Sequence, residues 1–135
     1  MRLERYLLAA FLVAMSAPLD SARADDRLSG TWAVDLASCG DVFTNRNGRP
    51  AFKRNSMDGA AGLIVSGKQM RGPRATCDLK SSKQQGDVLT LLLGCQSQIM
   101  FDKMTVSVRF EGPDKLVRFD PAFPEITTTY NRCSR

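Results

Sequence analysis

The chain has 135 residues, carries a formal net charge of +5 and contains no histidine. A chain of this length forms one domain with one modest core. The missing histidine removes the commonest general base and the commonest metal ligand, which argues against most acid–base catalysis and against a mixed zinc site. We therefore expect no metal, no cofactor and no enzymatic activity.

The first 24 residues have the features of a cleavable export signal. Two basic residues, Arg2 and Arg5, lie within the first five residues, and a short apolar run follows them. Ala22-Arg23-Ala24 then fits the small-residue pattern of a cleavage site. The apolar run is shorter than the ~20 residues that a membrane-spanning helix needs. We expect cleavage after Ala24, a single mature domain of residues 25–135 in the periplasm or medium, and no membrane span.

The first part of the mature chain reads as a strand followed by a hairpin. Residues 30–36 alternate apolar and polar side chains with period two, and Trp32 lies on the apolar face. Asn47-Gly48 is the strongest two-residue turn signal in the chain, because a type I′ turn needs positive φ at both central residues. A turn there places Phe43 opposite Phe52, which favours that register.

The remaining strands follow at hairpin spacing. Ser66-Gly67 and Gly112-Pro113-Asp114 are turn signals, and the strand 104–111 between them alternates cleanly. We expect an irregular segment at 120–124 and a last strand at 126–133. No segment carries a sustained helical period. The pattern predicts an all-β fold, an antiparallel meander of about eight strands that closes, or nearly closes, into a barrel.

Four cysteines follow the export signal: Cys39, Cys77, Cys95 and Cys133. An even number in an oxidising compartment indicates disulfides, and no C-x-x-C motif favours redox or metal chemistry. Four cysteines allow three connectivities. A hairpin centred on Gly86 sets Cys77 opposite Cys95 and favours that pair, which leaves Cys39 for Cys133.

The motif Gly30-Thr31-Trp32 resembles the opening strand of lipocalin-like (calycin-type) β-barrels, which carry a Gly-x-Trp motif. In that family the tryptophan lies at the closed end of the barrel, beneath an arginine from the end of the last strand. Arg132 holds the comparable position here. The resemblance implies a small barrel in which Arg132 stacks on Trp32 as a cation–π pair.

Two functional hypotheses follow from this fold. The first is a monomeric barrel that holds an apolar or amphipathic ligand, with Trp32, Val108 and Phe110 lining the interior. The second is a protein-interaction module of the cell envelope, for instance an inhibitor, that uses the basic side chains around the first hairpin. Nucleic acid is not an expected partner, because no aromatic residues interleave with the basic ones. The basic side chains in question are Arg46, Arg49, Lys53 and Arg54.

Phe123 lies between Pro121 and Pro124 in the expected irregular segment. An aromatic side chain in a rigid loop can serve as a partner anchor or as a lid over the barrel mouth. It can equally plug the end of the core, and we favour that interpretation.

Overall fold

The structure is a computed structural model that describes residues 26–35, 37–54 and 62–135. The predicted export signal, its cleavage after Ala24, and Leu36 of the predicted first strand lie outside the described residues. Within them no helix is long and apolar enough to cross a bilayer. The elements are a 3₁₀ helix η1 (Asp26–Leu28), β1 (Gly30–Val34), α1 (Cys39–Val42), β2 (Phe43–Arg46), β3 (Arg49–Phe52), β4 (Gly62–Ser66), β5 (Gln69–Arg71), β6 (Thr76–Gln85), β7 (Val88–Gln96), β8 (Phe101–Phe110), β9 (Lys115–Asp120) and β10 (Phe123–Ser134).

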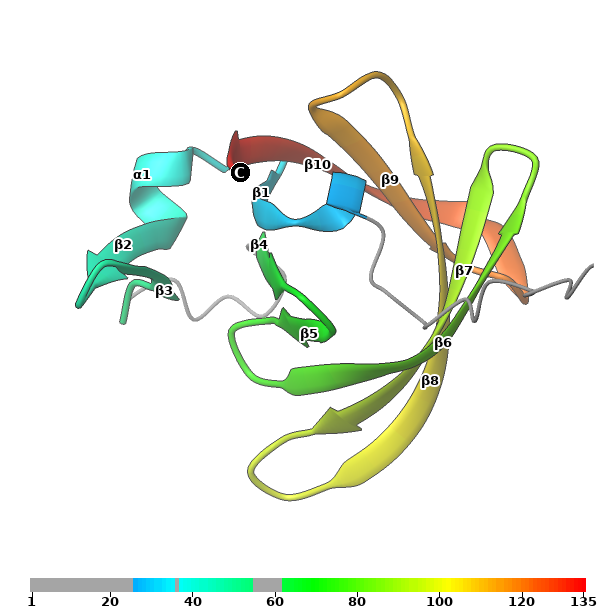
Figure 1. Ribbon diagram of the computed structural model, residues 1–135, viewed down its shortest axis with the longest axis horizontal. Coiled ribbons are helices and arrows are strands. Elements are labelled where there is room, and N and C mark those ends of the chain that lie inside the picture. Colours follow the sequence, from blue (N-terminus) through cyan, green and yellow to red (C-terminus); the bar gives the residue numbers. More distant parts are fainter. Residues whose placement is uncertain (1–25, 36, 55–61) are drawn as a thin grey trace, which may run out of the picture.

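Eight strands close into an antiparallel barrel in the order β1-β10-β9-β8-β7-β6-β5-β4. Strand β1 completes the closure because it pairs with β10 on one side and with β4 on the other. The hairpin β2–β3 forms its own sheet and stands with α1 beside the barrel, at the left of Figure 1. The predicted all-β barrel is confirmed.

The hairpin β2–β3 has the predicted turn. Asn47 and Gly48 both have positive φ, 53° and 75°, as a type I′ turn requires. Phe43 pairs with Phe52 in the register, and their ring centroids lie 5.4 Å apart. The aromatic pair therefore fixes a hairpin that lies outside the main core.

Both disulfides form as predicted, Cys39–Cys133 and Cys77–Cys95. The register that sets Cys77 opposite Cys95 arises differently from our expectation, however. The β6–β7 turn pairs Gln85 with Val88, so its centre lies half a residue beyond Gly86. A bulge at Lys80 then shifts the register and restores the cysteine pairing.

The turns of a meander alternate between the two ends of the barrel. We call the end that carries η1 the closed end and the opposite one the open end. The closed end carries η1 and the turns β4–β5, β6–β7 and β8–β9. The open end carries the turns β5–β6, β7–β8 and β9–β10. The largest fully buried side chains include Trp32, Leu28, Leu116 and Tyr130. Leu28 of η1 is among them, so η1 packs into the core from the closed end.

The last strand begins earlier than predicted. Strand β10 starts at Phe123 rather than at Ile126, and only Pro121-Ala122 separates it from β9. The Asp120 carboxylate accepts a hydrogen bond from the Ala122 N–H at 2.7 Å, which closes this turn tightly. Phe123 is 57% exposed, so the expectation that it plugs the core is wrong. The register is irregular between Phe123 and Thr127, and the proline-rich start of the strand is accommodated there.

Candidate functional site

The closed end is built around Trp32 and Arg132. These two residues are paired in the register of β1 and β10, and both side chains point into the barrel. The Arg132 guanidinium carbon lies 4.1 Å from the centroid of the Trp32 ring. Trp32 is fully buried and donates its indole N–H to the Leu28 carbonyl at 2.8 Å. The predicted cation–π pair is therefore present, and it holds η1 against the barrel.

Arg132 also bonds two separate segments, residues 27–29 and the β8–β9 turn, through its guanidinium. It donates to the Ser29 carbonyl at 2.5 Å, to the Arg27 carbonyl at 2.6 Å and to the Pro113 carbonyl at 3.2 Å. Burial lowers the pKa of Arg132, and the nearby charge of Arg135 lowers it further, whereas Asp114 raises it through charge and a hydrogen bond. Arginine is effectively always protonated in proteins, so Arg132 acts here as a permanent cross-link of the closed end.

A cavity of about 360 Å³ occupies the opposite, open half of the barrel. It reaches the rim at the β5–β6 turn, where the exposed Arg74 contributes to its lining. This volume falls within the ~300–1,000 Å³ typical of ligand pockets, and it exceeds the ~150 Å³ of a cavity that admits benzene. Apolar side chains supply much of the wall, namely Leu63, Met70, Leu93, Met104 and Val106.

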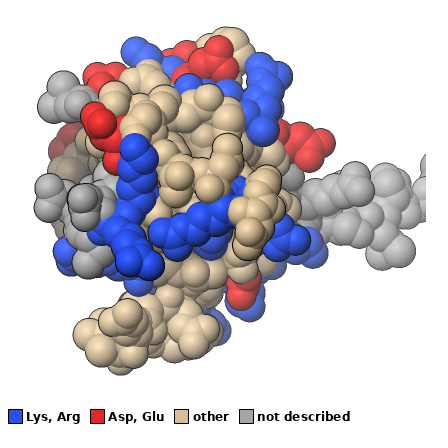
Figure 2. All heavy atoms as spheres, turned by 90° about the vertical axis from the view of Figure 1, so that its left-hand side faces the viewer, with Lys and Arg blue, Asp and Glu red and all other residues tan. Residues whose placement is uncertain are grey.

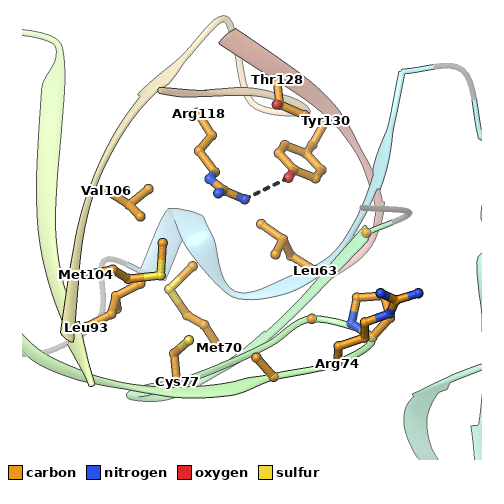
Figure 3. A pocket seen from close by; sticks show the side chains of 14 residues that line it. Leu63, Met70, Arg74, Cys77, Leu93, Met104, Val106, Arg118, Thr128 and Tyr130 are labelled. Atoms are coloured by element: carbon orange, nitrogen blue, oxygen red, sulfur yellow. Dashed lines mark hydrogen bonds between the residues drawn. The ribbon is translucent and has the colours of Figure 1, made fainter. Parts of the chain in front are cut away.

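One polar pair faces this apolar wall. Arg118 of β9 and Tyr130 of β10 point toward each other into the cavity, as Figure 3 shows. An Arg118 N–H donates to the Tyr130 hydroxyl at 3.3 Å, so that hydroxyl still has its own proton to donate. Among the described residues no carboxylate lies within ion-pair distance of Arg118. The pair therefore offers one positive charge and several unused donors to an apolar space, the chemistry that an anionic head group needs.

The residues predicted to line a ligand site do not line this open-end cavity, although Phe110 borders a separate hollow at the closed end with Arg27 and Arg132. Trp32 and Phe110 are brought together at the closed end, with ring centroids 6.3 Å apart. Phe110 is covered there by Arg27, whose guanidinium lies 4.5 Å from the ring centroid. Val108 is buried in the core, and none of Trp32, Val108 and Phe110 lines the open-end cavity.

The basic residues predicted to contact a partner gather on one side of the molecule. Arg46 and Arg49 face each other across the β2–β3 turn, and both are exposed. Lys53 and Arg54 follow β3 and are also exposed. Arg71 of β5 donates to the Pro50 carbonyl at 3.1 Å and so joins the hairpin to the barrel wall. Figure 2 looks onto this side and shows Lys and Arg side chains spread across it.

Sequence reasoning missed the pair Arg118 and Tyr130 as a site. The signal was present, because Arg118 has the same strand parity as Leu116, which is fully buried. Val117 between them is also buried, so the alternation along β9 does not reveal which face points inward. Tyr130 has the same parity as Arg132 and could have been placed inside by that relation.

The fold and the cavity define a small, closed antiparallel barrel with two disulfides, compatible with a lipocalin-like architecture. Comparison of the chain with protein-family models, with curated proteins and with solved structures finds no match. Among residues 26–35, 37–54 and 62–135, no group of three or more cysteine, aspartate or glutamate side chains could hold a metal ion.

Proposed function

We propose that this protein is an exported, lipocalin-like binding protein that holds a small amphipathic ligand with an anionic head in its open-end cavity. The observation that supports the proposal is Arg118, a cation inside an apolar cavity that no described carboxylate neutralises. Two disulfides are consistent with the oxidising compartment to which the sequence of residues 1–24 would direct the chain.

The ligand would lie across the cavity. Its anionic head would accept hydrogen bonds from Arg118 and from the hydroxyl of Tyr130, which the Arg118 contact orients. Its apolar part would lie against Met70, Leu93 and Met104 on the facing wall. This arrangement suits binding rather than acid–base catalysis, because the chain has no histidine and no aspartate or glutamate is among the described residues that line the cavity.

Isothermal titration with decanoate tests the proposal, with decanol as a probe that has the same chain and no charge. Replacing Arg118 by methionine keeps much of the side-chain volume and removes the charge. Hydrogen bonds to charged groups contribute about 1.5–3 kcal/mol, so R118M should weaken decanoate binding about tenfold to a hundredfold. Decanol binding should change little.

The matched control is R109M, which removes an arginine from the outer wall of the barrel. Arg109 lies over Phe119 at 5.8 Å and 3.7 Å from Glu111, away from the cavity. The control should bind decanoate like the unmodified protein. Equal decanoate affinity in R118M and R109M would refute the proposed head-group site.

A second candidate function is the envelope interaction module, and the hydrogen bond from Arg71 to Pro50 favours it. This contact places the basic hairpin beside the barrel wall, so its charges add to that of Arg71 in β5. An acidic protein partner would then bind with strong salt dependence. Replacing Arg46 and Arg49 by alanine should weaken capture of such a partner and leave decanoate binding unchanged, whereas R118M should do the reverse.

A further inference from the structure

The most exposed large apolar side chains cluster in two turns. Ile99 is 91% exposed, Met100 62% and Phe101 66%, and these three residues form what we call the apolar tip. Phe123 and Ile126, 57% and 68% exposed, lie at the start of β10 beside the β9–β10 turn. Single exposed apolar residues are ordinary, but three consecutive ones at a turn indicate a contact surface.

Both turns belong to the open end. The β7–β8 and β9–β10 turns fall on the same end of the meander as the β5–β6 turn, which lines the cavity mouth. A surface groove lined by Pro73, Arg74 and Ile99 shows that the β5–β6 turn and the apolar tip are direct neighbours. The apolar surface is therefore concentrated where a ligand would enter or leave.

The apolar tip is closed by a backbone hydrogen bond and projects from the barrel. The Ser97 N–H donates to the Met100 carbonyl at 2.9 Å, which leaves Gln98 and Ile99 at the apex of the turn. The β7–β8 turn is the lowest part of the molecule in Figure 1, and in Figure 2 it projects below the basic face as uncharged surface. A projecting tip of this kind suits insertion into a deformable layer better than packing against a flat protein surface.

Basic side chains surround the tip. Arg74 lies in the neighbouring turn, and Lys103 follows Phe101 on the same outer face of β8. Lys80 packs over Gly94 beside the Phe101 ring, since a Cβ at Gly94 would meet the Lys80 side chain at 2.8 Å and the ring at 3.7 Å. The acids Asp78 and Asp102 lie opposite Gly94 and Cys95, so the described charges beside the tip have an excess of one positive charge. The β9–β10 turn at the same end is acidic instead, because Asp120 and Glu125 are exposed there.

We propose that the barrel docks onto an anionic lipid bilayer through the apolar tip of its open end, with Ile99, Met100 and Phe101 inserted among the head groups. The flanking cations then contact lipid phosphates, and the cavity mouth faces the membrane surface. This combination of an apolar insert and surrounding basic residues is that of an interfacial anchor. Docking of this kind needs no occupied cavity, so its test is independent of the ligand proposal.

Vesicle co-sedimentation of the oxidised protein tests the docking. The probes are vesicles of phosphatidylcholine alone and vesicles of an equimolar mixture with phosphatidylglycerol. We expect the protein to bind the mixed vesicles at least tenfold more tightly than the neutral ones, with affinity falling as salt rises. The double variant I99S/F101S should lose at least tenfold in binding to the mixed vesicles.

The matched control is L92S, which places serine on the outer wall of β7, where Leu92 is 37% exposed. It should bind mixed vesicles like the unmodified protein. Near-UV circular dichroism establishes that each variant is folded, and a tryptophan at position 99 (I99W) should shift its fluorescence to shorter wavelength when it enters the bilayer.

Three outcomes would overturn the proposal. The first is absence of binding to the mixed vesicles by the unmodified protein. The second is full binding by I99S/F101S, which would assign the association to charge alone. The third is a dimer in solution that the tip variant converts to a monomer, which would make the apolar tip a contact between copies of the chain.

Discussion

Replacement of Arg132 by methionine is the sharpest test of how the closed end is held. The change removes the cation stacked on Trp32 at 4.1 Å and the hydrogen bonds to the Ser29, Arg27 and Pro113 carbonyls. A desolvated cation–π contact contributes about 2 kcal/mol, and a charge-assisted bond to the half-buried Ser29 carbonyl about 1.5–3 kcal/mol. The Arg27 and Pro113 bonds lie on the exposed side, so water replaces them at little cost.

Burying the Arg132 guanidinium costs free energy, because the group loses its water shell. R132M does not have this cost, so about 1 kcal/mol or more of the lost stability is offset. We therefore expect R132M to lower the free energy of unfolding by about 2–4 kcal/mol, or Tm by on the order of 10 °C. Urea unfolding with intact disulfides, followed by the fluorescence of the sole tryptophan, measures it directly. R132K keeps the charge but lacks the planar fork that reaches the carbonyls of residues 27–29 and of Pro113, so its stability should be intermediate.

R109M is the matched control for this prediction too. Its cation–π contact with Phe119 is longer, 5.8 Å, and its ion pair with Glu111 is solvent-exposed. Exposed pairs of this kind contribute between nothing and about 1 kcal/mol. If R132M proved no less stable than R109M, the closed end would not depend on Arg132, which would refute its role as a cross-link there.

Two further predictions concern the cross-links and the cavity. The Cys39–Cys133 bridge closes a loop of 94 residues and the Cys77–Cys95 bridge one of 18. The chain-entropy relation gives a stabilisation of about 4.7 kcal/mol for the first bridge and about 3.2 kcal/mol for the second. In urea unfolding, C39S/C133S should therefore be less stable than C77S/C95S by about 1.5 kcal/mol. R118M should be as stable in the same assay as the unmodified protein, or more stable, because it removes a cation from the barrel interior; a loss above about 1 kcal/mol would indicate a structural role instead.

Local chemistry made much of this fold predictable. Asn47-Gly48 predicted the turn of the first hairpin, because few residue pairs readily adopt two successive positive φ angles. The resemblance of Gly30-Thr31-Trp32 to the opening strand of lipocalin-like barrels predicted the stack of Arg132 on Trp32, which the structure contains. The cysteine pairs followed from strand register and from the small number of alternatives.

The features that the sequence did not reveal depend on how strands curve and close. The bulge at Lys80 leaves no turn residue or break in alternation, so the predicted β6–β7 register is right from Thr76 to Leu79 and wrong by one residue from Ser81 to the turn. The lining of the open-end cavity was not predicted, because the depth of a side chain along the barrel axis depends on closure and not on parity. Arg118 was hidden for a related reason, since Val117 beside it is also buried.

The proposed ligand site depends on an anionic head group bound by Arg118 and Tyr130. We would measure the carboxyl resonance of decanoate labelled with ¹³C at that carbon, in the presence of the oxidised protein and of R118M. We expect a separate bound resonance whose position resists acidification, because the neighbouring guanidinium lowers the carboxyl pKa, and we expect its loss in R118M. No bound resonance, or the same one in both proteins, would contradict binding of the head group at Arg118.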